Sequence, residues 1–128
     1  MSAKQSWTAW LPLGLYSALV IQSAVMPPDA FRFLARFNDK LIHGVEYFLL
    51  FWFAFRAFTN SQAQSFRLRA PQHSFYYCLA MGALTEGLQY FTPNRSASGE
   101  DFAADALGAG FGYLILKWRL ARPRRTHP

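Results

Sequence analysis

Four long apolar segments follow one another along the chain, separated by shorter polar stretches. No charged residue occurs from Gln5 to Pro28, a run of 24 residues. Such a run forms about 36 Å of helix and is long enough to span a bilayer. Pro27, Pro28 and Asp29 end the segment, because tandem prolines cannot continue a helix. The pattern predicts membrane-spanning helices at about residues 7–26, 41–58, 74–91 and 102–120.

The polar stretches Asn60–Gln72 and Thr92–Glu100 are typical of loops. Within the apolar segments, bulky residues lie on every side, as in Tyr47–Phe55 (YFLLFWFAF). A strand would show alternating apolar and polar residues, and a helix of a soluble bundle would keep a polar face. A cleaved signal peptide is disfavoured for the first segment, because Pro12 and Gly14 interrupt it and it is long. We therefore expect an all-α bundle of four transmembrane helices.

Composition limits the remaining classes of protein. The chain has 128 residues, 52% of them hydrophobic and 18% aromatic, which excludes a disordered basic tail. This length allows a single domain, residues 1–128. The one cysteine, Cys78, excludes an intrachain disulfide framework and a multi-cysteine zinc site. The net charge of +6 leaves a nucleic-acid binder or a membrane protein with basic cytoplasmic ends.

The side of the membrane on which each charge lies separates these two classes. Four spans place both termini on one side, together with nine basic residues and no acidic residue: Lys4, Arg56, Arg67, Arg69, Lys117, Arg119, Arg122, Arg124 and Arg125. The other side and the membrane hold four basic and seven acidic residues: Arg32, Arg36, Lys40, Arg95, Asp29, Asp39, Glu46, Glu86, Glu100, Asp101 and Asp105. The positive-inside rule then makes both termini cytoplasmic. We expect no nucleic-acid partner, because the basic tail lacks a folded platform to read bases.

Polar residues inside the spans gather near the outer face. Each ionisable group at a helix centre costs roughly 2.5–3.5 kcal/mol on insertion, so its presence needs a reason. Three helices bring such residues to one depth, and Arg95 in the turn before the last span would overhang them with a guanidinium suited to a phosphate or a carboxylate. The predicted binding residues are Asp39, Lys40, His43, Tyr47, Glu86, Gln89, Arg95, Asp101 and Asp105. They either neutralise one another and pin the helix ends or bind a ligand.

Two further features concern local structure. Ala104, Gly108 and Gly112 form a small-residue face that allows another helix backbone to approach closely, which we interpret as packing. Asn94 favours a tight turn before Arg95, because asparagine tolerates the left-handed conformation.

The same residues carry a resemblance to a known family. The matching strings are Asp39-Lys40-Leu41-Ile42-His43 with Tyr47, Glu86-x-x-Gln89 with Tyr90-Phe91-Thr92-Pro93-Asn94-Arg95, and Asp101 with Ala104-Asp105-x-x-Gly108-Ala109 and Gly112. In order and spacing they resemble the VanZ-like family, named for a teicoplanin resistance protein, over about residues 39–112. The chain departs from the family pattern at Asn94, Thr85 and Gly44, and Glu46 lies outside it.

The resemblance implies a multi-pass protein of the bacterial inner membrane, linked in some members to reduced glycopeptide susceptibility, without a settled reaction. We expect the polar layer to engage an anionic envelope lipid or a lipid-linked cell-wall precursor, with membrane lipids as partners. The alternative is an intramembrane enzyme acting on a lipid-linked headgroup, with His43, Glu86 and Asp105 as catalytic candidates. Proton or ion movement is a third hypothesis. We expect no cofactor and no metal, because the helical spacing of His43, Glu86 and Asp105 is no metal motif.

Overall fold

The computed structural model describes residues 3–27 and 38–123 of the chain, with side chains from residue 7 onward. These residues form five helices and no strand: α1 (Ala3–Val25), α2 (Asp39–Thr59), α3 (Gln64–Leu68), α4 (Ala70–Phe91) and α5 (Gly99–Ala121). The predicted all-α fold is therefore confirmed. Pro28, Asp29, Arg32, Arg36, Arg124 and Arg125, which the sequence predictions use, lie outside the described residues, as does the side chain of Lys4.

The four long helices coincide with the four predicted apolar segments, but each begins before its predicted start, and α2 and α5 also end one residue later than predicted. α5 begins at Gly99, before the predicted start at residue 102, and its first turn contains Glu100 and Asp101. Acidic residues there are favourable because the amino end of a helix carries a partial positive charge. By length and mean hydropathy, α1 from Trp7 to Val25 and α2 are apolar enough to cross a membrane.

The predicted loop Asn60–Gln72 is partly wrong, because most of it is helical. α3 occupies its middle and α4 already begins at Ala70, with a proline in its first turn, where the missing N–H is not needed. The ring of Phe66 in α3 contacts the rings of Phe58 and His73 at centroid distances of 5.7 and 4.9 Å. This aromatic contact holds the short helix against α2 and α4.

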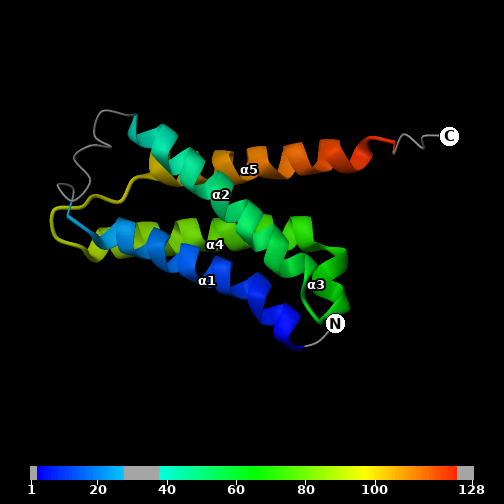
Figure 1. Cartoon of the computed structure of the whole chain (residues 1–128). Helices are drawn as coiled ribbons and strands as arrows, with labels where there is room; N and C mark the ends of the chain where they lie inside the picture. Colours follow the sequence, from blue (N-terminus) through cyan, green and yellow to red (C-terminus); the bar gives the residue numbers. More distant parts are fainter. Residues whose placement is uncertain (1–2, 28–37, 124–128) are drawn as a thin grey trace.

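α2 packs against α1, α4 and α5, and most extensively against α5 (Figure 1). Leu50, Phe51, Ala54 and Ala57 on α2 are fully buried. α1 begins and α5 ends at one end of the bundle, where α3 also lies. The connection from α4 to α5 and the first residues of α2 lie at the other end. We call this second end the polar end, because all described acidic residues belong to its half of the helices.

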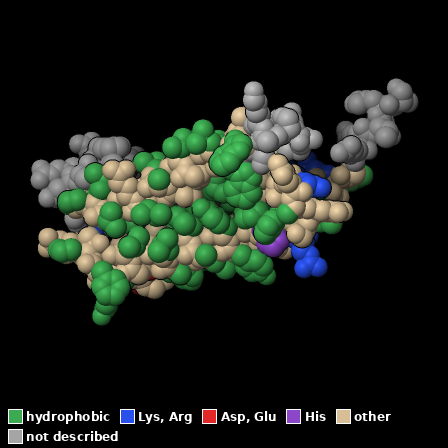
Figure 2. All heavy atoms as spheres, turned by 90° about the horizontal axis from the view of Figure 1, so that it is seen from below, with side chains coloured by type: hydrophobic (Ala, Val, Ile, Leu, Met, Phe, Trp, Pro, Cys, Tyr) green, Lys and Arg blue, Asp and Glu red, His purple; other side chains and the backbone are tan. Residues whose placement is uncertain are grey.

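The outer surface of the bundle is largely apolar. Figure 2 shows hydrophobic side chains along the middle of one long face, with most of the visible Lys and Arg side chains at the end where α1 begins. α5 exposes Leu107, Phe111, Leu114 and Trp118 by 56–75%. Such a surface suits lipid, because large exposed apolar patches are unusual on proteins dissolved in water.

Candidate functional site

The polar end is built where the first turns of α2 and α5 meet. α2 starts after Asn38, whose side chain accepts a hydrogen bond of 2.9 Å from the backbone N–H of Lys40 and so caps the helix. The helical spacing then directs Lys40 and His43 toward α5. On α5, Asp101 and Asp105 lie one turn apart, so both face α2.

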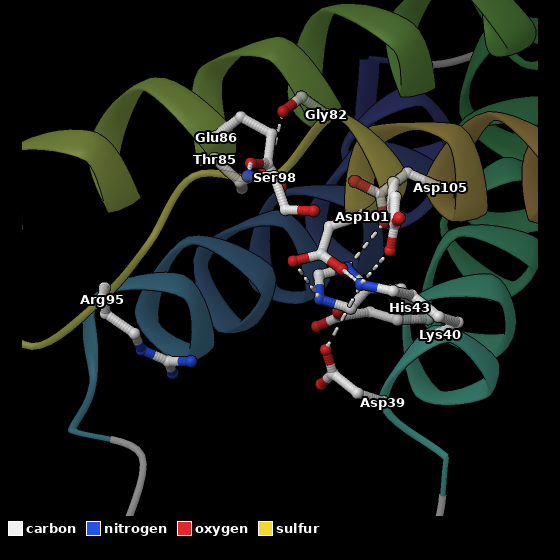
Figure 3. A network of polar contacts seen from close by, with 12 residues as sticks. Asp39, Lys40, His43, Gly82, Thr85, Glu86, Arg95, Ser98, Asp101 and Asp105 are labelled. Atoms are coloured by element: carbon white, nitrogen blue, oxygen red, sulfur yellow. Dashed lines mark hydrogen bonds and ion pairs between the residues drawn. The ribbon is translucent and has the colours of Figure 1, made fainter.

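Lys40 is the cation at the mouth of this end (Figure 3). Its ammonium donates a hydrogen bond to Asp101 Oδ1 and lies 3.9 Å from Asp39 Oδ2 and 3.8 Å from Glu100 Oε2. The Lys40 side chain is 40% exposed, whereas that of Asp101 is only 11% exposed. Lys40 therefore neutralises a nearly buried carboxylate and still reaches the surface.

His43 lies one turn deeper and joins the two aspartates of α5. Its Nδ1–H donates to Asp105 Oδ1 at 2.8 Å, and its Nε2 lies 3.9 Å from Asp101 Oδ2. The Asp105 side chain is 2% exposed and that of His43 is 16% exposed. Because a carboxylate oxygen accepts, the pair fixes the ring orientation and directs Nε2 toward Asp101.

A close approach of two glycines makes this pairing possible. A Cβ on Gly108 of α5 would lie 2.0 Å from the backbone oxygen of Gly44 on α2, far inside van der Waals contact. A Cβ on Gly112 would lie 2.7 Å from the ring of Phe51. The interpretation of the small-residue face as packing is therefore confirmed at these two positions. Gly44, a departure from the family pattern, lies against Gly108, and Phe51 lies against Gly112.

Tyr47, which shares a helical face with His43, faces α4 instead of the carboxylates. It is 1% exposed, and its hydroxyl lies 3.0 Å from Thr85 Oγ1. Thr85 Oγ1 is in turn 3.0 Å from the backbone oxygen of Gly82, to which it donates. In this structure Tyr47 ties α2 to α4 one turn below the site.

Glu86 of α4 faces the connection to α5, and the Gln89 side chain is buried. Glu86 Oε2 accepts a hydrogen bond of 2.7 Å from the backbone N–H of Ser98 and so orders the residue before α5. Glu86 Oε1, Gln89 Oε1 and Asp105 Oδ2 are buried and have no hydrogen-bond partner in the described part of the chain. Asp105 Oδ2 faces α4, since it lies 3.4 Å from the Cβ position of Gly82.

Arg95 does not join the carboxylates, contrary to the prediction that it overhangs them. Its Nε donates to the backbone oxygen of Met26 and its Nη2 to that of Ser23, each at 2.8 Å. These carbonyls end α1 and lack partners within the helix, so Arg95 caps α1 and lies apart from His43 and Lys40 in Figure 3. Asn94 has a φ of 61°, which confirms the expected left-handed turn before it.

Glu46, which the sequence prediction leaves out of the site, connects α2 to α1. Ser23 Oγ donates to Glu46 Oε1 and Tyr16 Oη donates to the Glu46 backbone oxygen, each at 3.0 Å. An ionisable residue inside an apolar segment is the signal that could have identified it, because such a residue needs a partner.

Three of the site residues could hold a metal ion together. Asp39, His43 and Asp101 each offer a ligand atom, and these atoms lie within 4.8 Å of one another. This set shares only His43 with His43, Glu86 and Asp105, the three residues considered from the sequence. Glu86 Oε2 accepts from the Ser98 backbone and Asp105 Oδ1 accepts from His43. The enzyme hypothesis with His43 or Glu86 as acid or base stays a hypothesis.

The apolar exposed surface and the two helices long and apolar enough to cross a membrane are typical of an α-helical membrane protein. The chain belongs to the VanZ/LLP1 family, whose sequence profile matches residues 3–121 of the 128. The predicted resemblance is thereby confirmed. Comparisons with curated proteins and with solved structures gave no match.

Proposed function

We propose that this VanZ-like envelope protein spans the bacterial inner membrane four times and binds an anionic headgroup at its polar end. The headgroup belongs to an envelope lipid or to a lipid-linked cell-wall precursor. Through this ligand the protein affects susceptibility to glycopeptides such as teicoplanin. The observation that carries the proposal is Lys40, a partly exposed cation placed among hydrogen-bonding groups at the end of an apolar bundle.

Four spans are supported by the surfaces of α4 and α5. α5 exposes large apolar residues along one face, and α4 exposes Tyr76 by 63%, Leu84 by 46% and Phe91 by 83%. Both helices are 22 or 23 residues long, enough to cross a hydrocarbon core of about 30 Å. Lipid contact accounts for these exposed side chains better than water does.

The basic residues support the orientation. Arg56, Arg67, Arg69, Lys117, Arg119 and Arg122 lie at or near the end opposite the polar end. Arg122 stacks over the ring of Trp118, 3.5 Å from its centroid. An aromatic residue beside a cation is typical of the membrane interface, and a basic interface marks the cytoplasmic side. The polar end then faces outward, where envelope lipids and exported precursors are found.

The biological test is complementation of a strain that lacks this protein, scored for teicoplanin susceptibility and for lipid composition. Lys40→Ala should fail to complement, because it removes the exposed cation at the polar end. Lys117→Ala is the matched control, since it removes a lysine from the opposite end. Equal complementation by both variants, at equal amounts in the membrane, would contradict a role for the polar end.

A further inference from the structure

Among the described residues, the cluster around Lys40 and His43 contains more negative than positive groups. Asp39, Glu100 and Asp101 surround the ammonium of Lys40, and Asp105 is paired with His43. Four carboxylates therefore face one lysine and one histidine. A phosphate that approached these groups would meet a net negative field, so a further positive charge at this cluster would strengthen the binding of an anion.

His43 is oriented as metal-binding histidines are. Ligating histidines usually donate the N–H of the other ring nitrogen to a carboxylate or carbonyl, which fixes the ring and strengthens the ligand nitrogen. Here the 2.8 Å bond from Nδ1 to Asp105 Oδ1 has this role. It leaves Nε2 facing Asp101 Oδ2 at 3.9 Å.

Asp101 can accept a hydrogen bond from Lys40 and bind a metal ion at the same time. Its Oδ1 accepts the hydrogen bond from Lys40, while its Oδ2 faces His43 Nε2. Asp39 completes the set from the first turn of α2, and its side chain is 71% exposed. Lys40 therefore stays beside the metal position, where its ammonium can contact a phosphate.

We propose that Asp39, His43 and Asp101 bind a divalent cation, and that this cation bridges the polar end to the phosphate of the headgroup. The bridging role rests on the proposed function, whereas metal binding alone does not. One imidazole with two carboxylates suits a transition ion such as Mn²⁺ or Zn²⁺. Asp105 is then a positioning residue that acts through His43.

The distances allow such a site after small movements. The three ligand atoms lie within 4.8 Å of one another, so a point between them is about 2.8 Å or less from each, against bonds of about 2.0–2.2 Å to zinc. Each side chain would move inward by roughly 0.6 Å. Asp39 can do so because it is exposed, and water or phosphate oxygens would complete the coordination.

The first experiment measures Mn²⁺ binding by electron paramagnetic resonance, with full-length protein in phosphatidylcholine nanodiscs. Wild type should bind one Mn²⁺ per chain, and Asp39→Asn should weaken binding by about tenfold or more. Glu100→Gln is the matched control, because it also removes an exposed carboxylate beside Lys40. Glu100 is not in the ligand set, so the Mn²⁺ affinity of this variant should stay within about twofold of wild type. Absence of Mn²⁺ binding by wild type, or equal losses in the two variants, would overturn the metal site.

The second experiment measures phosphatidylglycerol binding by the same proteins, with Mn²⁺ or with EDTA. The bridge predicts phosphatidylglycerol binding that EDTA and Asp39→Asn both weaken and that Glu100→Gln does not weaken. Binding that is indifferent to EDTA would overturn the bridge and leave the proposed function standing. Mn²⁺ binding without any phosphatidylglycerol binding would overturn the bridge and would also count against the proposed function.

Discussion

Replacement of Gly108 by alanine should force α2 and α5 apart next to the site. The added Cβ would lie 2.0 Å from the Gly44 oxygen, 2.8 Å from its carbonyl carbon and 2.9 Å from its Cα. All three are backbone atoms, so no side-chain rotation can relieve the overlap. Gly44 follows His43 directly, and Gly108 lies three residues after Asp105, so the displacement acts on the histidine–aspartate pair.

The size of the helix displacement follows from the contact distances. Ordinary contact of a Cβ begins at 3.4 Å, so the helices must separate by about 1.4 Å at this point. A shift of this size would stretch the 2.8 Å bond between His43 and Asp105 beyond hydrogen-bonding distance. Overpacking costs about 1–3 kcal/mol, and the better helix propensity of alanine offsets about 1 kcal/mol of it.

Thermal unfolding of the detergent-solubilised variants measures this effect. Gly110→Ala is the matched control on the same helix, because its Cβ would meet only the Phe75 ring, at 3.8 Å. Gly108→Ala should unfold at a lower temperature than wild type, and Gly110→Ala at the same or a higher temperature. If Gly108→Ala is as stable as Gly110→Ala, the close approach of Gly44 and Gly108 does not hold the bundle together.

Three other predictions concern separate parts of the molecule. Arg95→Ala should lower the free energy of unfolding by about 1.5–3 kcal/mol, because two α1 carbonyls lose a charged donor, while metal binding by the protein stays unchanged. Tyr47→Phe should cost only about 1 kcal/mol, since Thr85 keeps its bond to the Gly82 oxygen; a change in Mn²⁺ affinity would place Tyr47 in the site after all. Reporter fusions should be active in the cytoplasm at Asn60 and in the periplasm at Ser98, and the reverse pattern would refute the orientation.

Much of the fold could be predicted from hydrophobic pattern alone, because long uncharged segments leave few alternatives to helices. The four long helices lie where that pattern indicates them. α3 could not be predicted in the same way, since it has five residues and a polar sequence, and its stability comes from ring contacts of Phe66 with residues of α2 and α4.

The site was predictable where helical spacing sets the direction of a side chain. His43 on α2 and the pair Asp101 and Asp105 on α5 meet as their spacing indicates. Arg95 and Glu46 could not be placed, because their partners are mainly backbone atoms or residues of α1. A sequence does not indicate which backbone oxygen a side chain binds, so the capping role of Arg95 is seen only in the three-dimensional structure.

The central claim is that the polar end binds an anionic headgroup through Lys40 and its neighbours. Native mass spectrometry of protein extracted from the membrane, with its bound lipids retained, tests this most directly. We expect wild type and Lys117→Ala to retain an anionic phospholipid or a lipid-linked precursor, and Lys40→Ala to lose it. Wild type without bound anionic lipid, or equal lipid retention by Lys40→Ala, would contradict headgroup binding at the polar end.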